Sequence, residues 1–311
     1  MHFCYIRVLL LRSTILLLCL QLLQPATAQL RFQYNDDGIL PAALEVQTWS
    51  DSGTPFTDEG LYYLLQKRWS VVNDALPGIS YSDKHVWIRI PLYQLQQRGP
   101  IHWVDIHNPH INRLRAWLVQ GDSIIHSFPL TGDAFPFNTR SVPSQSFLFS
   151  LHSYPLTHTS LILAADKRLT KLDMPIHFQS NEHFVAHVDI DVKGLMFFLG
   201  FAFFLFLFNA YLFLTTTESV FGWYLAYLTL ICLYVCTDAG LMFKLVYPGL
   251  PALNDIIRPA SFALSVAPMM LFFNKILEVR SHAPRFYLVN RWLFWIYFVL
   301  FVMAVGSSAI T

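Results

Sequence analysis

The densest group of residues that could do chemistry lies between Trp103 and Val119. His107 and His110 flank an Asn-Pro step, and His102 and Asp105 stand just upstream. Imidazole and carboxylate groups at this spacing could bind a metal ion, titrate near neutral pH or contact a ligand. A zinc site needs three or four fixed ligands, which two neighbouring histidines do not establish. The sequence therefore predicts no metal and no cofactor, and favours turn residues while leaving ligand contact open.

The sequence contains none of the spacings that mark the common enzyme classes. Gly-x-Ser-x-Gly, His-Glu-x-x-His, a phosphate-binding loop and paired kinase motifs are absent. Cys232 and Cys236 are one helical turn apart inside an apolar run, which favours packing over redox or metal chemistry. A net charge of +1 gives no argument for nucleic-acid binding. We therefore expect a protein that is not an enzyme.

Aromatic side chains are the better candidates for ligand contact in the first half of the chain. Trp87 and Trp117 alternate with aliphatic residues, so each falls on the face of its strand opposite the aliphatic one. That position predicts a surface role or a place against a second sheet, and it leaves sugar stacking and core packing open. Arg89 shares the face of Trp87. We take Trp87, Arg89 and Trp117 as ligand-binding candidates, together with His107 and His110.

Short alternating segments must position these side chains. From Val86 to Leu92 every second residue is apolar, which is typical of a strand with one buried face. The segment from Leu114 to Leu118 alternates in the same way, and this places Arg113 and Arg115 on the opposite, solvated face. Residues 101–106 predict a further strand.

Turn residues separate these strands at short intervals. Asn108-Pro109 predicts a turn, because proline fixes its own φ and restricts the residue before it. Helical periodicity is weak and confined to the segment from Glu59 to Trp69. Residues 29–190 are therefore predicted to form one all-β sandwich, with a jelly-roll-like arrangement.

Long uncharged runs crowd the second half of the chain. Only 13% of all residues are charged, against roughly 25% in ordinary soluble domains. A helix needs about 20 apolar residues to cross a bilayer. The third of the predicted spans is the least regular, because it contains Arg258 and Pro268, and Arg258 is expected to snorkel to the interface. The predicted α-helical bundle has spans at residues 194–214, 220–238, 256–274 and 292–311.

Two polar residues stand out in these apolar runs. Asn209 lies inside the first span and Asp238 at the end of the second. Such residues usually bond to neighbouring helices, because lipid offers no hydrogen-bond partner. We therefore predict interhelical contacts for both side chains.

Residues 1–28 are typical of a secretory signal peptide. Arg7 and Arg12 precede an apolar stretch that is too short to span, and an Ala-x-Ala pattern ends at Ala28. Cleavage there would export the domain at residues 29–190. Four crossings then return the chain to the outer side at Thr311. We expect a multi-pass protein of the inner membrane with a periplasmic N-terminal domain.

The order of these segments and several local motifs resemble the seven-transmembrane receptors with diverse intracellular signalling modules. The exported part is similar to the family's type 2 extracellular domain in YSDKHVWIRIPL, WVDIHNPHINRLRAWLV, the Gly132-Asp133 turn, and SFLFSL followed by LDMPIHF. The membrane part is similar in GLMFFLGFAFFLFLFNAYLFL, ESVFGWYLAYL, DAGLMFKLVYPGL and FFNKILEVRSHAPRF. The resemblance covers roughly residues 40 to 311, and the order of the motifs makes it specific.

The resemblance implies a bacterial receptor whose exported domain binds a ligand, with carbohydrate as the expected class. Its helices would pass the signal to a cytoplasmic output module. Four spans are expected here where the family has seven, so we expect a truncated or short relative. A membrane-anchored ligand- or surface-binding adaptor with no signalling output is the alternative. The expected partners are the lipid bilayer, a small-molecule or carbohydrate ligand in the periplasm, and a second copy of the chain or a separate output protein.

Overall fold

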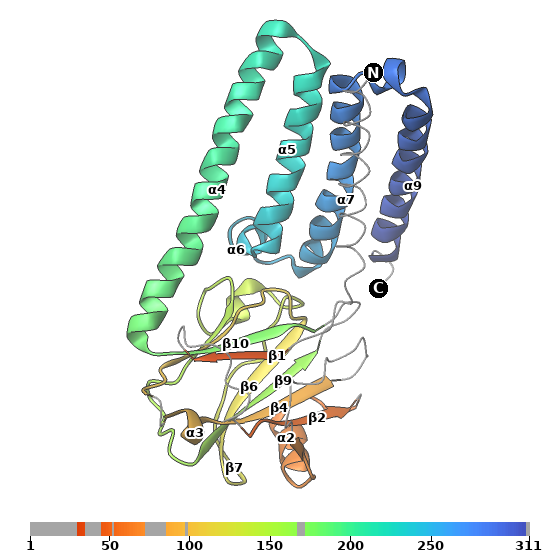
Figure 1. Ribbon diagram of the computed structural model, residues 1–311. Coiled ribbons are helices and arrows are strands. Elements are labelled where there is room, and N and C mark those ends of the chain that lie inside the picture. The colour runs from red at the N-terminus through yellow and green to blue at the C-terminus, as the bar shows by residue number, and fades with distance from the viewer. Residues whose placement is uncertain are drawn as a thin grey trace, which may run out of the picture.

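The computed structural model describes residues 30–34, 45–51, 53–71, 85–96, 99–166 and 172–308. A β-sandwich is followed by a bundle of long helices that stands over one end of it (Figure 1). The predicted signal peptide at residues 1–28 lies outside the described residues. The prediction of an all-β domain followed by four candidate spans is confirmed.

The sandwich is built from two sheets. The smaller sheet has the strand order β1-β10-β5-β8, and the larger has the order β3-β2-β4-β9-β6-β7. β1 runs parallel to β10, and the other pairings are antiparallel. The strands are β1 (Leu30–Tyr34), β2 (Gln47–Asp51), β3 (Ser70–Val71), β4 (His85–Pro91), β5 (Trp103–Ile106), β6 (Arg113–Gln120), β7 (Ser123–Ser127), β8 (Phe147–Ser150), β9 (Thr159–Asp166) and β10 (Met174–Gln179).

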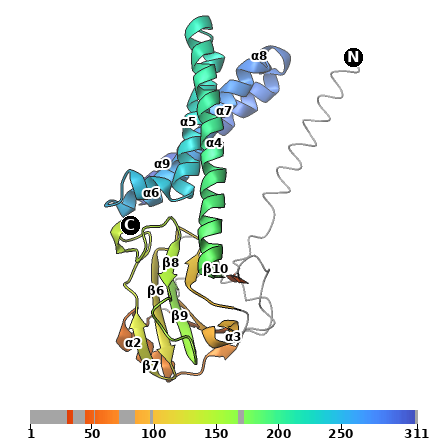
Figure 2. The same ribbon diagram turned by 90° about the vertical axis from the view of Figure 1, so that its left-hand side faces the viewer.

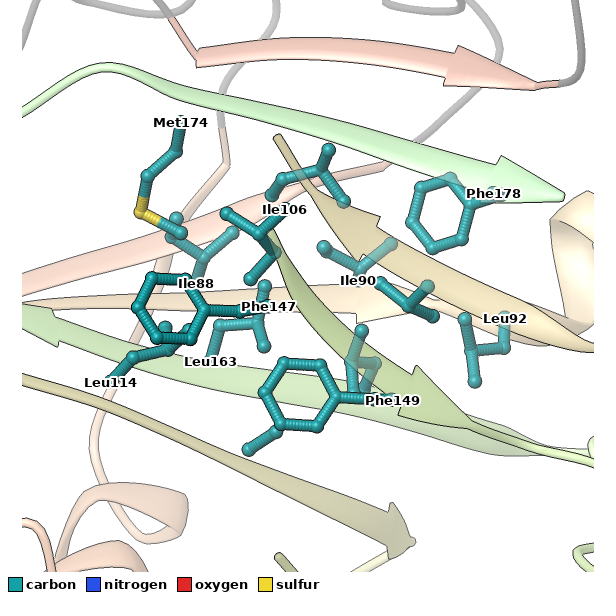
Figure 3. Close-up of a cluster of buried hydrophobic side chains, with 14 of the residues drawn as sticks. Ile88, Ile90, Leu92, Ile106, Leu114, Phe147, Phe149, Leu163, Met174 and Phe178 are labelled. Atoms are coloured by element: carbon teal, nitrogen blue, oxygen red, sulfur yellow. The ribbon is translucent and has the colours of Figure 1, made fainter. Parts of the chain in front are cut away.

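The main core lies between the two sheets (Figure 3). It contains the alternating apolar residues of β4 and β6 that the sequence placed on one face, so both inward faces are confirmed. Burial of such side chains is the main force that holds two sheets together, at about 25 cal/mol for each Å² of apolar surface removed from water. The core side chains labelled in Figure 3 are Ile88, Ile90, Leu92, Ile106, Leu114, Phe147, Phe149, Leu163, Met174 and Phe178.

A second, smaller core covers the outer face of the larger sheet. Helix α2 (Asp58–Leu65) packs there, and the side-chain oxygen of Thr57 caps it by accepting from Gly60 N. Trp87 and Trp117 lie beneath it, both fully buried and stacked with ring centroids 5.4 Å apart. They are thus buried on the face opposite the main core, and the element that covers them is a helix instead of the second sheet that alternation suggested.

Arg115 differs from its predicted place on a solvated face. Its guanidinium lies under α2, where Nη2 donates to Asp58 Oδ1 at 3.0 Å and Nη1 donates to the carbonyl oxygen of Phe56 at 2.7 Å. Alternation correctly placed Arg115 opposite the core, but it could not show that a helix covers that face.

The membrane part begins without a break in the chain. Helix α4 (Asn181–Thr216) starts directly after β10 and continues through the first candidate span, Lys193–Thr216. Its 36 residues correspond to about 54 Å, whereas the hydrocarbon core of a bilayer is about 30 Å thick. The first turns of α4 therefore project from the bundle towards the sandwich, as Figure 2 shows.

The other helices complete the bundle. They are α5 (Ser219–Asp238), α6 (Leu241–Leu245), α7 (Pro251–Ile276), α8 (Val279–His282) and α9 (Pro284–Ser308). α7 and α9 begin earlier than predicted, each with a proline in the first turn, where its missing N–H costs nothing. The apolar runs located the spans, but the helices extend beyond them into polar sequence.

Candidate functional site

The sandwich contacts the helical bundle through an apolar cluster at its membrane-facing end. Phe137, in a 3-10 turn of the sandwich (Phe137–Thr139), packs edge-on against Phe243 of α6 with ring centroids 5.7 Å apart. Tyr247 completes the cluster, and all three residues are buried. The amide of Phe137 also donates to the carbonyl oxygen of Pro248 at 2.8 Å. We call this contact, with the polar groups around it, the junction.

His110 is the polar centre of the junction. It is 7% exposed, and its Nε2 lies 2.9 Å from the carbonyl oxygen of Asp238 at the end of α5. Because a carbonyl oxygen only accepts, Nε2 carries the proton. In the neutral ring Nδ1 is then an acceptor for the Asn254 amide of α7, at 3.4 Å. One side chain of the sandwich thus joins two membrane helices.

The predicted Asn-Pro turn presents this histidine. The side-chain oxygen of Asn108 accepts from the backbone N–H of His110 at 2.9 Å, which closes the turn. Pro109 follows and packs against Gly240, whose φ of +73° lies in the left-handed region. A Cβ added at Gly240 would lie 3.1 Å from Pro109 Cβ, so glycine suits both the backbone and the close approach.

Two carboxylates lie close to the His110 ring, and one of them is paired with an arginine of the bundle. Asp133 Oδ2 lies 4.0 Å from His110 Nδ1, and Asp238 Oδ1 lies 3.8 Å from Nε2. Asp238 also pairs with Arg258 Nε of α7 at 3.3 Å. Asp238 therefore contacts α7 and reaches the sandwich as well.

Arg140 holds the loop of the sandwich that meets α6. Its Nη1 donates to the carbonyl oxygens of Ser144 at 2.8 Å and Gln145 at 2.5 Å. Its guanidinium also lies over the rings of Phe137 and Phe243, at 4.7 Å and 5.9 Å from the centroids. Burial lowers the pKa of Arg140 to about 10, partly opposed by Asp133, so this group remains charged at neutral pH.

The root of α4 forms a second link between sandwich and bundle. Trp103 of β5 stacks on Phe184 with centroids 4.5 Å apart, and its indole Nε1 donates to Asn181 Oδ1 at 3.1 Å. The backbone N–H of Asn181 donates to His102 Nδ1 at 3.1 Å. Ser180 caps the helix by accepting from His183 N. The residues between β10 and the first candidate span thus form the first part of a continuous helix.

The candidate ligand residues do not converge on one place. His107 is half exposed, with Nδ1 3.6 Å from Asp105 Oδ2, and its ring stacks on His177, whereas His110 bonds to Asp238. Trp87, Arg89 and Trp117 share the outer face of the larger sheet, and the two tryptophans are covered by α2. Their burial is an observation against stacking of a sugar on either ring.

Other residues of that face are exposed and were not singled out from the sequence. Tyr62 and Tyr63 of α2 are 48% and 54% exposed, and Lys67 lies over the Tyr63 ring at 4.5 Å. The signal for them is the helical spacing of buried Leu61 and Leu64, which leaves both tyrosines on the outward side. Within the described ranges no group of three or more metal-ligating side chains is close enough to hold a metal ion.

Asn209 behaves differently from the prediction. Its Nδ2 donates to the carbonyl oxygen of Leu205, one turn back in the same helix, at 2.8 Å. This bond satisfies the amide within α4. The interhelical partner expected for Asn209 is not among its described hydrogen bonds, because the helix backbone one turn away is a nearer acceptor.

The fold and the junction define a β-sandwich docked on four helices that are long and apolar enough to cross a membrane. The family model for the 7TMR-DISM extracellular 2 domain matches residues 44–180, and the model for the 7TM diverse intracellular signalling region matches residues 194–311. The chain therefore belongs to the 7TMR-DISM family, and it is a membrane receptor with an extracellular sensing domain. No curated protein matches the chain.

Proposed function

We propose that the protein is a sensory receptor of the bacterial inner membrane that binds a periplasmic carbohydrate and passes the binding event to its helices through the junction. The observation that carries the proposal is that buried side chains of the sandwich contact two different membrane helices. His110 joins α5 to α7, and Phe137 packs on α6 between them. A shift of the sandwich therefore changes how these helices meet.

The carbohydrate would bind away from the membrane, on α2. Tyr62 and Tyr63 are about half exposed there, at the part of the sandwich far from the bundle (Figure 1). Beneath them, Asp58 Oδ1 accepts from Arg115, Trp117 and Ser127, and this ties α2 to strands β6 and β7. β6 begins at Arg113, close to the turn that contains His110, so α2 and the junction share one strand.

A glycan array probed with the full chain in lipid nanodiscs tests this function. We expect the parent to bind a subset of glycans and the double variant Tyr62→Ala/Tyr63→Ala to bind them about tenfold more weakly, a loss of ~1.4 kcal/mol. Tyr93→Ala is the matched control, because Tyr93 is 40% exposed on another part of the sandwich. A parent that binds no glycan, or a double variant that binds as well as the parent, would contradict the proposal.

A further inference from the structure

His110 is a titratable group buried where the sandwich and the bundle meet. An unperturbed histidine titrates near pH 6.5 (about the middle of the range that an extracellular domain meets). Its ring is held by a carbonyl oxygen at Nε2 and by an amide at Nδ1. Addition of a proton can occur only at Nδ1, because Nε2 already carries one.

The residues around Nδ1 can accommodate that proton. In the neutral state Nδ1 accepts from Nδ2 of Asn254, and Oδ1 of the same amide is buried with no hydrogen-bond partner among the described residues. A half-turn of the amide presents Oδ1 to the new N–H, so the bond between His110 and α7 is kept in both states. Nε2 continues to donate to Asp238, and the link to α5 is unchanged.

The charges that face the ring favour the cation. Asp133 lies 4.0 Å from Nδ1 on the sandwich side, and Asp238 lies 3.8 Å from Nε2 on the helix side. The cations nearby act on these carboxylates: Arg258 pairs with Asp238, and Arg140 interacts with Asp133. Asp255, the next residue along α7, is exposed. Both carboxylates lie within 4.0 Å of a ring nitrogen. Asp133 belongs to the sandwich, as His110 does, whereas Asp238 belongs to α5.

We propose that His110 makes the junction sensitive to the pH outside the membrane, with docking of the sandwich on the helices strengthened as pH falls. A charged His110 bridges Asp133 of the sandwich and Asp238 of α5, whereas in the undocked sandwich it loses Asp238 and faces water. The pH response requires that the attraction of these two carboxylates exceed the cost of burying the charged ring, so that the docked state binds the proton more tightly. By linkage, a fall in pH favours the state that binds more protons. The receptor would thus respond to acid as a second input, beside its ligand.

The amide of Phe137 reports docking directly, because its hydrogen bond to Pro248 crosses the junction. We would measure its hydrogen exchange in the full chain in nanodiscs, at about pH 7.5 and about pH 5.5, each rate divided by the intrinsic rate at that pH. A tenfold difference in proton affinity between the docked and undocked states gives about a fivefold rise in protection over this pH interval. His110→Gln, which keeps a donor for Asp238 and cannot be charged, should show no rise.

His152→Gln is the matched control, because His152 stacks on His102 in the sandwich and lies outside the junction. It should behave as the parent does. Equal protection at the two pH values in the parent, or a rise that survives in His110→Gln, overturns the pH response while leaving the junction intact. A Phe137 amide that is unprotected at both pH values overturns the junction, and with it the signalling route of the proposed function.

Discussion

The two links between sandwich and bundle hold the same parts together in different ways. At the root of α4 the chain is continuous, and β10 passes into a helix that is capped by Ser180 and braced by Trp103. At the junction nothing is covalent: His110, Phe137 and Arg140 of the sandwich meet α5, α6 and α7 through side chains. One link fixes where the sandwich is attached, and the other depends on side-chain contacts that could break without unfolding either part.

This difference indicates which of the two links would transmit a signal from the sandwich to the helices. Local opening within a folded protein begins where few buried apolar contacts and few backbone hydrogen bonds hold a region. The junction has a cluster centred on three buried aromatic residues and, among the residues that the structure describes, one backbone hydrogen bond across it, from Phe137 to Pro248. We therefore expect the sandwich to pivot about the α4 root while the junction makes and breaks.

The largest effect is expected from Arg140→Ala. Loss of this side chain leaves the carbonyl oxygens of Ser144 and Gln145 without their donor and removes the charge packed on Phe137 and Phe243. Bonds from a charged donor contribute about 1.5–3 kcal/mol each, so docking should be abolished. Hydrogen exchange in the segment 132–140 should rise to that of an undocked loop. Arg68→Ala, at an exposed arginine of the same domain, should leave it unchanged.

A smaller effect is expected from Trp103→Ala. This variant removes the stack on Phe184 and the indole bond to Asn181, yet the helix remains joined to β10 by the chain. We expect a loss of about 1–2 kcal/mol in the protection of the first turn of α4, from one neutral hydrogen bond and one aromatic pair. Exchange at the junction should change little. An equal loss at both links would mean that the sandwich is attached as one rigid unit.

The smallest effect is expected from protonation of Asp58, which lies far from both links. Hydrogen bonds from Trp117 and Ser127, with the charge of Arg115, hold the pKa of Asp58 below its ordinary value although burial opposes them. A carboxylate with a lowered pKa in the folded state stabilises that state above the unfolded pKa, about 3.9, and this contribution is lost as pH falls through the folded pKa. Thermal unfolding of the parent should therefore show a loss of stability below about pH 4 that Asp58→Asn lacks.

Local patterns in the sequence were enough to predict the strands and the spans. They were not enough to predict which element covers the outer face of the larger sheet. A period of two residues placed Val86 to Leu92 and Leu114 to Leu118 correctly, because alternation records which face is buried. It could not show that the other face, with Trp87, is buried too, since α2 is only eight residues long and its helical period is weak. An eight-residue amphipathic segment contains too few turns to distinguish it from a loop.

The contacts of the junction could not be predicted from the sequence, for a different reason. His110 meets Asp238 and Asn254 across 128 and 144 residues, and the resemblance to a family supplied no such pairing. The Asn-Pro turn was predicted correctly, and Asp238, for which an interhelical contact was expected, pairs with Arg258 of α7. The fold brings the end of α5 onto the Asn-Pro turn, and this contact between distant segments could not be predicted from either local pattern.

Hydrogen exchange of the unmodified chain in nanodiscs tests most directly the claim that the junction opens while the α4 root holds. The two reporters are the amide of Phe137, whose bond crosses the junction, and the amide of Phe184, which donates to Ser180 in the first turn of α4. The account predicts that both are protected and that Phe137 exchanges at least about tenfold faster, a difference of ~1.4 kcal/mol in opening free energy. Exchange that is equal at the two amides, or faster at Phe184, would contradict it.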